Sequence, residues 1–223
     1  MKEDQPPRTP EVFLAEFAIQ AFATLIGAAA AFGLEALRRR HERQDAHIEQ
    51  FKAALFVLIL HRTFLRTLHA QHLMPRREDP IRAYSLHPIL VAPPHERVDL
   101  LALSFLLSSK EAELLNKLGV AEAQYRSVVA LVEQRNQLHF AFQARLQVAG
   151  TSEATLDDIR GIAGKMLGRQ LEDLTSEMYR TTEHAIGFNR DVYVAAVSSF
   201  KRLFPKSSMF GVEDLPLSKS EAA

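Results

Sequence analysis

From Leu156 to Met178 the chain reads LDDIRGIAGKMLGRQLEDLTSEM. Its apolar residues recur at spacings of three and four, at Leu156, Ile159, Ala163, Leu167, Leu171, Leu174 and Met178. Such a stripe is typical of a helix that packs lengthwise against neighbouring helices. The pattern predicts a helix from Thr155 to about Thr182, which continues or restarts over residues 189–203.

Two other long segments are predicted to be helical. Nothing breaks a helix from Leu37 until Pro75. A second helix is expected to begin at a capping box, with Ser108 at the N-cap and Glu111 three residues on, and to run to about Val148. No segment shows a strand pattern, and most connections are short, which favours antiparallel neighbours. Residues 37–204 are therefore predicted to form an all-α, antiparallel bundle of four or five helices.

The remaining parts of the chain are expected to be irregular or short. Residues 75–97 contain five prolines, which predicts a proline-rich loop, and residues 98–107 are predicted to be a short apolar helix. Residues 205–223 are polar and predict a flexible C-terminal tail.

An apolar segment near the N-terminus predicts a membrane anchor. Phe17–Leu34 has 18 residues without a charge, and extension back to Val12 admits only Glu16. As a helix this longer segment would span about 34 Å, against roughly 30 Å for the hydrocarbon core of a bilayer. We therefore predict a transmembrane helix at residues 12–36, after a short non-cytoplasmic N-terminus at residues 1–11. A buried core helix is the alternative.

Charge next to this segment predicts its orientation. Basic residues follow it directly, at Arg38, Arg39, Arg40 and Arg43, whereas acidic residues prevail before it. Because positive charge concentrates on the cytoplasmic side, the N-terminus is expected outside and the C-terminal domain in the cytoplasm, at the inner membrane. The four arginines are expected to lie at the membrane surface, next to the lipid headgroups of the bilayer.

Small residues recur every four positions within the predicted anchor, at Ala23, Gly27 and Ala31. This spacing allows close approach of two helices and predicts a homo-oligomer contact, unless it only reflects a high alanine content. The formal net charge is zero, so bulk charge gives no reason to expect a nucleic-acid partner. The chain has no cysteine, which removes disulfides and thiolate chemistry.

Polar residues interrupt the apolar stripes of two helices. On the first, the residues at this spacing are Ile48, Phe51, Leu55, Leu58, Arg62, Leu65, His69 and His72. On the second they are Ala121, Tyr125, Val128, Val132, Arg135, His139, Phe142 and Leu146. If the helices are neighbours, one polar layer could contain Arg62, His69, Arg135, Asn136 and His139. A structural role, with arginine stems snorkelling and histidines bonded to carbonyls, is one interpretation; a site in the bundle core, with Asn136 as a binding residue, is the other.

The spacing of Arg62 and His69, an arginine and a histidine with six residues between them, loosely resembles the signature of HEPN-type ribonuclease domains, which are also helical bundles. The resemblance covers two residues and the fold class. It would imply that the pair acts on a scissile phosphate, usually across a dimer. Arg135-Asn136 also suits that family, but His139 follows too closely.

The sequence contains no motif for the other common kinds of catalysis or cofactor binding. A glycine-rich phosphate loop, a His-Glu-x-x-His helix and a nucleophile elbow are all absent from the sequence, so no cofactor and no metal site are predicted. The leading hypothesis is a membrane-anchored interaction or scaffold protein with an unknown protein partner. A membrane-tethered ribonuclease or nucleotide-acting bundle is the alternative, and a membrane-perturbing effector is a third.

Overall fold

The computed structural model describes residues 10–150 and 155–208, except for the side chains of residues 10–19, 21 and 156. Its elements are, in order, α1 (Pro10–Thr67), η1 (Leu68–Leu73), η2 (Met74–Arg76), α2 (Arg82–Ser85), α3 (Phe105–Ser108), α4 (Ala112–Ala149), α5 (Leu156–Ala163) and α6 (Lys165–Leu203). No strand occurs in the described ranges, so the prediction of an all-α fold is confirmed. The chain divides into two compact units, Met1–His47 and Ile48–Ala223.

The first unit consists of the N-terminal part of α1. Every side chain described from Gln20 to Ala46 is exposed. Within the described part of the chain, no helix is both long enough and apolar enough to cross a membrane. The segment predicted as a transmembrane helix, residues 12–36, is thus helical in α1 but has no further support, and the side chains of residues 12–19 and 21 lie outside the description.

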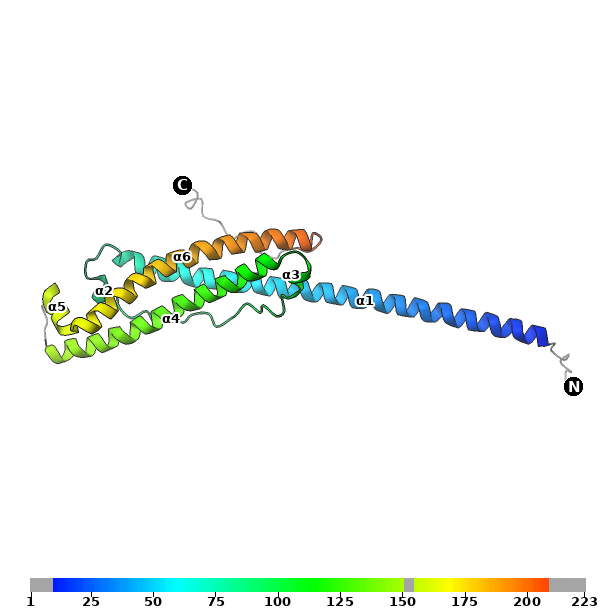
Figure 1. Cartoon of the computed structure of the whole chain (residues 1–223), viewed down its shortest axis with the longest axis horizontal. Coiled ribbons are helices and arrows are strands. Elements are labelled where there is room, and N and C mark those ends of the chain that lie inside the picture. Colours follow the sequence, from blue (N-terminus) through cyan, green and yellow to red (C-terminus); the bar gives the residue numbers. More distant parts are fainter. Residues whose placement is uncertain (1–9, 151–154, 209–223) are drawn as a thin grey trace. The chain divides into compact units, whose positions relative to one another are not determined.

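The second unit is a bundle of three long helices, formed by α1 from Ile48 onward, α4 and α6. Figure 1 shows α4 and α6 lying side by side. Near one end, the ring of Phe51 lies 5.5 Å from that of Phe200 and 6.3 Å from that of Phe204. Helix α6 therefore runs antiparallel to α1. An ion pair between Glu111, at the start of α4, and Arg202, at the end of α6, shows that α6 is antiparallel to α4 as well. Helices α1 and α4 thus run parallel to each other, so the prediction of an antiparallel bundle is wrong for this pair. The four or five helices predicted resolve into three long ones and the short α2, α3 and α5.

The start of α4 differs from the prediction. Ser108 is the last residue of α3, Lys110 adopts a left-handed conformation with φ of 64°, and α4 begins only at Ala112. The carboxylate of Glu111 does not cap this helix. It accepts a hydrogen bond from Ser199 Oγ at 2.9 Å, on α6. The predicted capping box at Ser108 is wrong because its acidic residue makes a contact between helices instead.

The expected stripe from Leu156 to Met178 spans two helices. Thr155 caps α5 in a true capping box with Asp158, but the helix ends at Ala163. Gly164 has φ of 75° and ψ of 155°, and its N–H donates to the carbonyl of Arg160 at 2.9 Å. A side chain is strained in this conformation, so the glycine fixes the break between α5 and α6.

Replacement of Gly164 by alanine is expected to lower the free energy of unfolding by about 1–3 kcal/mol, because alanine at this φ is strained. An added Cβ would also lie 3.1 Å from Arg145 Nη1. Gly161→Ala is the matched control, since Gly161 lies within helix α5 with open space around a Cβ, and this change should stabilise by up to about 1 kcal/mol. Urea unfolding of both variants measures the difference, and equal effects would contradict the assignment.

Helix α6 carries three buried polar residues seven positions apart, Thr175, Thr182 and Asn189. Their side-chain polar atoms have no hydrogen-bond partner among the described residues. A spacing of seven places them along one line of the helix, facing the bundle core. Buried polar groups of this kind lower stability and can fix the register of packed helices.

The segment between η2 and α4 positions the candidate site. After the short α2, residues 86–98 have no regular secondary structure, and turns lead from there into α3. The predicted loop at 75–97 thus contains one short helix, and the helix predicted at 98–107 is reduced to Phe105–Ser108. Figure 1 shows this irregular segment running along the bundle beside α4.

Candidate functional site

Residues 86–98, here called the strap, lie against the groove between α1 and α4. Residues 87–98 make no backbone-to-backbone hydrogen bond with any described residue. Three aliphatic side chains of the strap are buried, those of Leu86, Ile89 and Val98. The strap is therefore held by side chains of the two helices, and these contacts define the candidate site.

Arg135 and Asn136 of α4 hold the first part of the strap. The Arg135 side chain is fully buried, and its guanidinium donates to the carbonyls of Ala83 at 3.1 Å, His87 at 3.3 Å and Leu86. The Asn136 amide accepts a hydrogen bond from the N–H of Ile89 at 3.0 Å and donates to the carbonyl of the same residue at 2.8 Å.

His61, Glu122 and Tyr125 hold the second part. The fully buried ring of His61 stacks on that of Tyr125, with centroids 3.6 Å apart, and His61 Nε2 donates to the carbonyl of Glu96 at 3.0 Å. Tyr125 donates its hydroxyl to the carbonyl of Pro94 at 2.9 Å. Glu122 accepts from the N–H of Val98 at 3.3 Å, so each contact is again to the main chain of the strap.

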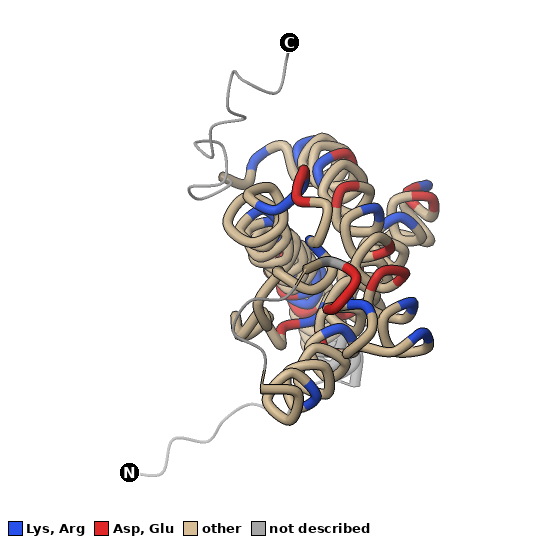
Figure 2. The backbone as a smooth tube through the Cα atoms, turned by 90° about the vertical axis from the view of Figure 1, so that its left-hand side faces the viewer, with Lys and Arg blue, Asp and Glu red and all other residues tan. Residues whose placement is uncertain are grey.

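A cavity of about 240 Å³ remains between the strap and α4. Its lining carries charges of both signs, from Glu96, Arg97, Glu122, Arg126 and Glu133. The Nδ1 atom of His61 has no hydrogen-bond partner among the described residues and lies 3.9 Å from a carboxylate oxygen of Glu122. Figure 2 shows positive and negative residues interspersed along the helices, so the groove is not part of a field of one sign.

Burial perturbs the ionisation of several residues of the site, and it raises the pKa of the Tyr125 phenol. Desolvation, together with the nearby charge of Arg135 and His87, lowers the pKa of His139 to about 4. Desolvation also lowers the pKa of Arg135 to about 10, which leaves it charged at neutral pH. The pKa of His61 is lowered too, chiefly by burial. At neutral pH both histidines are therefore neutral. The unprotonated Nδ1 of His139 can then accept a hydrogen bond from Arg135 Nη2, at 3.4 Å.

His69 lies in a different part of the bundle. It belongs to the π-helix η1, and its Nε2 is 3.5 Å from a carboxylate oxygen of Glu183 on α6. The same oxygen accepts a hydrogen bond from Arg77 at 2.6 Å. This cluster borders a surface hollow of about 300 Å³ that is also lined by Arg66, Ala70 and Ile186.

The predicted polar layer is therefore divided. Arg135, Asn136 and His139 come together under the strap, and His69 pairs with Glu183. Arg62 lies close enough to Tyr193 of α6 for its charge to oppose the rise in the pKa of that phenol. The ion pair of His69 with Glu183 involves neither Arg135 nor His139.

The described residues contain no group of three or more His, Asp or Glu side chains placed to hold a metal ion. Two groups suited to proton transfer, His61 and His139, are closed off from solvent, with 0% and 2% exposure. The geometry under the strap is suited to holding an extended polypeptide by its main chain.

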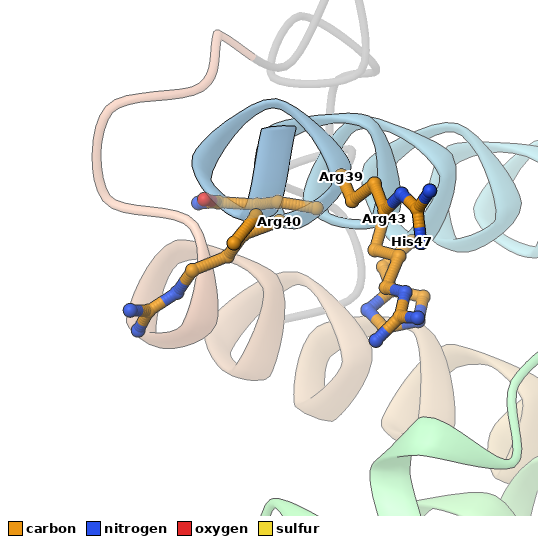
Figure 3. Close-up of a pocket in the computed structure, with 6 residues that line it drawn as sticks. Arg39, Arg40, Arg43 and His47 are labelled. Carbon is orange, nitrogen blue, oxygen red and sulfur yellow. The ribbon is translucent and has the colours of Figure 1, made fainter. Parts of the chain in front are cut away.

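The basic residues of α1 at positions 38–40 and 43 are all exposed. Arg38 pairs with Glu42 and Arg39 with Glu35, each at 2.8 Å. Figure 3 shows Arg39, Arg43 and His47 together along this helix, with Arg40 extending away from them. The small residues Ala23, Gly27 and Ala31 are exposed too, and a Cβ at Gly27 would meet no described atom within 4 Å.

Comparisons with family models, curated proteins and solved structures find no match to this chain. The site is thus interpreted from its own geometry.

Sequence reasoning missed His61, Glu122 and Tyr125 as partners of the strap. His61 lies one residue before the expected stripe position Arg62, and Glu122 is a charged residue next to the stripe position Ala121. The apolar periodicity therefore does not predict that His61 and Glu122 are buried. The one available signal was Tyr125 on the stripe itself, since a buried tyrosine hydroxyl usually needs a hydrogen-bond partner.

Proposed function

We propose that this chain is a single-pass, membrane-anchored helical interaction or scaffold protein, with its bundle at the cytoplasmic face of the inner membrane. The observation that carries the proposal is the uncharged run Phe17–Leu34 followed directly by an exposed basic cluster. Arg40 and Arg43 belong to that cluster, and cationic side chains next to an apolar helix favour both anionic lipid and a cytoplasmic orientation. Self-association through Ala23, Gly27 and Ala31 is part of the proposal.

The bundle itself supports a binding role rather than a catalytic one. Catalysis on a phosphate by arginine and histidine needs both groups at the reacting atoms, with the arginine donors turned towards them. Arg135 instead directs its donors to carbonyls of its own chain. The ribonuclease alternative has no specific observation in its favour, whereas the strap contacts are those of a surface that holds polypeptide.

The proposal is tested by cell fractionation and a topology reporter fused after Ala223. The full-length chain is expected in the membrane fraction with the reporter in the cytoplasm, and deletion of residues 1–36 is expected to release the bundle into the soluble fraction. Replacing Arg38, Arg39, Arg40 and Arg43 by glutamate should weaken or invert the orientation, since it removes the positive flank.

Lysine at the same four positions is the matched control, because it keeps the charge and should keep the orientation. A full-length chain that remains soluble without detergent would overturn the anchor. A reporter found outside the cell would overturn the orientation.

A further inference from the structure

We infer that the groove between α1 and α4 is the partner-binding surface of this protein, and that the strap occupies it as an internal ligand. The partner is an extended, proline-containing polypeptide segment that displaces the strap. This inference rests on the proposed interaction function and identifies the surface and the chemistry of the partner.

The first support is the kind of contact that the groove makes. Asn136 binds both the N–H and the carbonyl of one strap residue, Ile89, which is how a side chain holds an extended peptide without reading its sequence. Tyr125 and His61 donate to strap carbonyls in the same manner. Any extended segment offers the same main-chain groups, so these contacts do not depend on the strap being part of the same chain.

The second support is that the strap is held weakly at residues 90–92, between the buried Ile89 and the prolines. Ile89 and Val98 are buried, at 3% and 7% exposure, but between them Leu90 is 80% exposed. The main chain of this part has no backbone partner among the described residues, and a hollow of about 240 Å³ remains between residues 93–97 of the strap and α4. Segments with few buried contacts open at low free-energy cost.

The two buried aliphatic residues of the strap, Ile89 and Val98, and the prolines between them indicate which sequence a partner needs. An aliphatic residue at the position of Ile89 would be followed by a pair of prolines at the positions of Pro93 and Pro94 and a second aliphatic residue at that of Val98. Proline suits this surface because it favours extended backbone and leaves no N–H unsatisfied.

The test uses the full-length chain in detergent, with a specific protease site inserted after Leu90, where the strap is exposed. Cutting there keeps every element but lowers the effective concentration of the strap at the groove. The probe is a fluorescent peptide with the sequence of residues 86–98, LHPILVAPPHERV. Fluorescence anisotropy is expected to show binding at least about tenfold tighter to cut than to uncut protein, because the peptide no longer competes with an intact strap.

Asn136→Ala in the cut protein should weaken peptide binding at least about tenfold, through loss of both bonds to the main chain. Gln137→Ala, at the exposed neighbouring position, is the matched control and should leave binding unchanged. A peptide with aspartate in place of Ile89 should not bind.

Circular dichroism of the cut protein decides the remaining outcomes. A cut chain that unfolds would overturn the inference, since the bundle would then need its strap. A cut chain that stays folded and does not bind the peptide, or that binds equally well with Asn136→Ala, would also overturn it. None of these results concerns the membrane fraction, so the anchor proposal stands or fails separately.

Discussion

Replacing Arg135 by leucine should lower the free energy of unfolding by about 3–5 kcal/mol, because it removes the donor to three carbonyls at once. The guanidinium is the donor to the carbonyls of Ala83, Leu86 and His87. Leucine would leave these acceptors without a donor in a buried place, and each unsatisfied group costs about 1–3 kcal/mol. Chemical denaturation measures the loss, and retained helical content at low denaturant shows that the fold persists.

Sequence reasoning leads to the opposite expectation for a structural Arg135, because an apolar residue often replaces a buried ion network without loss. That argument requires both partners of the network to be replaced, whereas the partners here are main-chain carbonyls that no substitution removes. Arg180→Leu is the control, since Arg180 is exposed and its ion pair among the described residues is with Glu177 of its own helix, so it should change stability by less than about 0.5 kcal/mol. An unchanged stability of Arg135→Leu would contradict the contacts described.

Lowering the pH from 7.5 to 4.5 should cost the bundle about 2–3 kcal/mol through His139 alone. The pKa of this residue is about 4 in the folded chain, below its ordinary value of 6.5. The unfolded chain therefore takes up a proton first, and stability present above pH 6.5 is lost as the pH falls towards 4. Burial, which disfavours the charged imidazolium, is the main cause of this lowered pKa, and protonation would also bring a second positive charge next to Arg135.

The measurement is the urea midpoint of unfolding at several pH values, for the wild-type chain and for His139→Gln. Glutamine does not titrate, so the variant should lose less stability between these pH values. A part of the slope should remain, because burial also lowers the pKa of His61. Parallel curves for the two proteins would show that His139 does not carry the acid sensitivity.

The sequence predicts the core stripes well where the helices are regular. Phe51, Leu55, Leu58 and Leu65 of α1 are buried as their spacing indicates, and so are Arg135 and His139 of α4. The same rule fails at Arg62, where the neighbouring His61 is buried instead, and again after Thr67. There the chain forms a π-helix, and the buried residues are Leu68 and Leu73, five apart, rather than His69 and His72. The wider turn of a π-helix changes which later residues face the core, and no sequence pattern here predicts that turn.

The site could not be predicted because its partners are far apart in sequence. Asn136 and Ile89 are 47 residues apart, and His61 is 35 residues from Glu96. Periodicity indicates that Asn136 lies beside a buried position, but it does not say which loop will cover that position. The proline count predicts an irregular segment, and only the three-dimensional structure shows that this segment is extended along a groove.

When a groove binds the main chain of a segment, the side chains of that segment can change during evolution without loss of binding. In related chains, the exposed positions 90–92 and 95–97 of the strap should accept many residues, because no hydrogen bond depends on their side chains in the described structure. The amide at Asn136 and the hydroxyl at Tyr125 have no such freedom, since each meets main-chain atoms at a fixed place. A groove built in this way could change partners during evolution by substitutions in the partner alone, while its own residues stay the same.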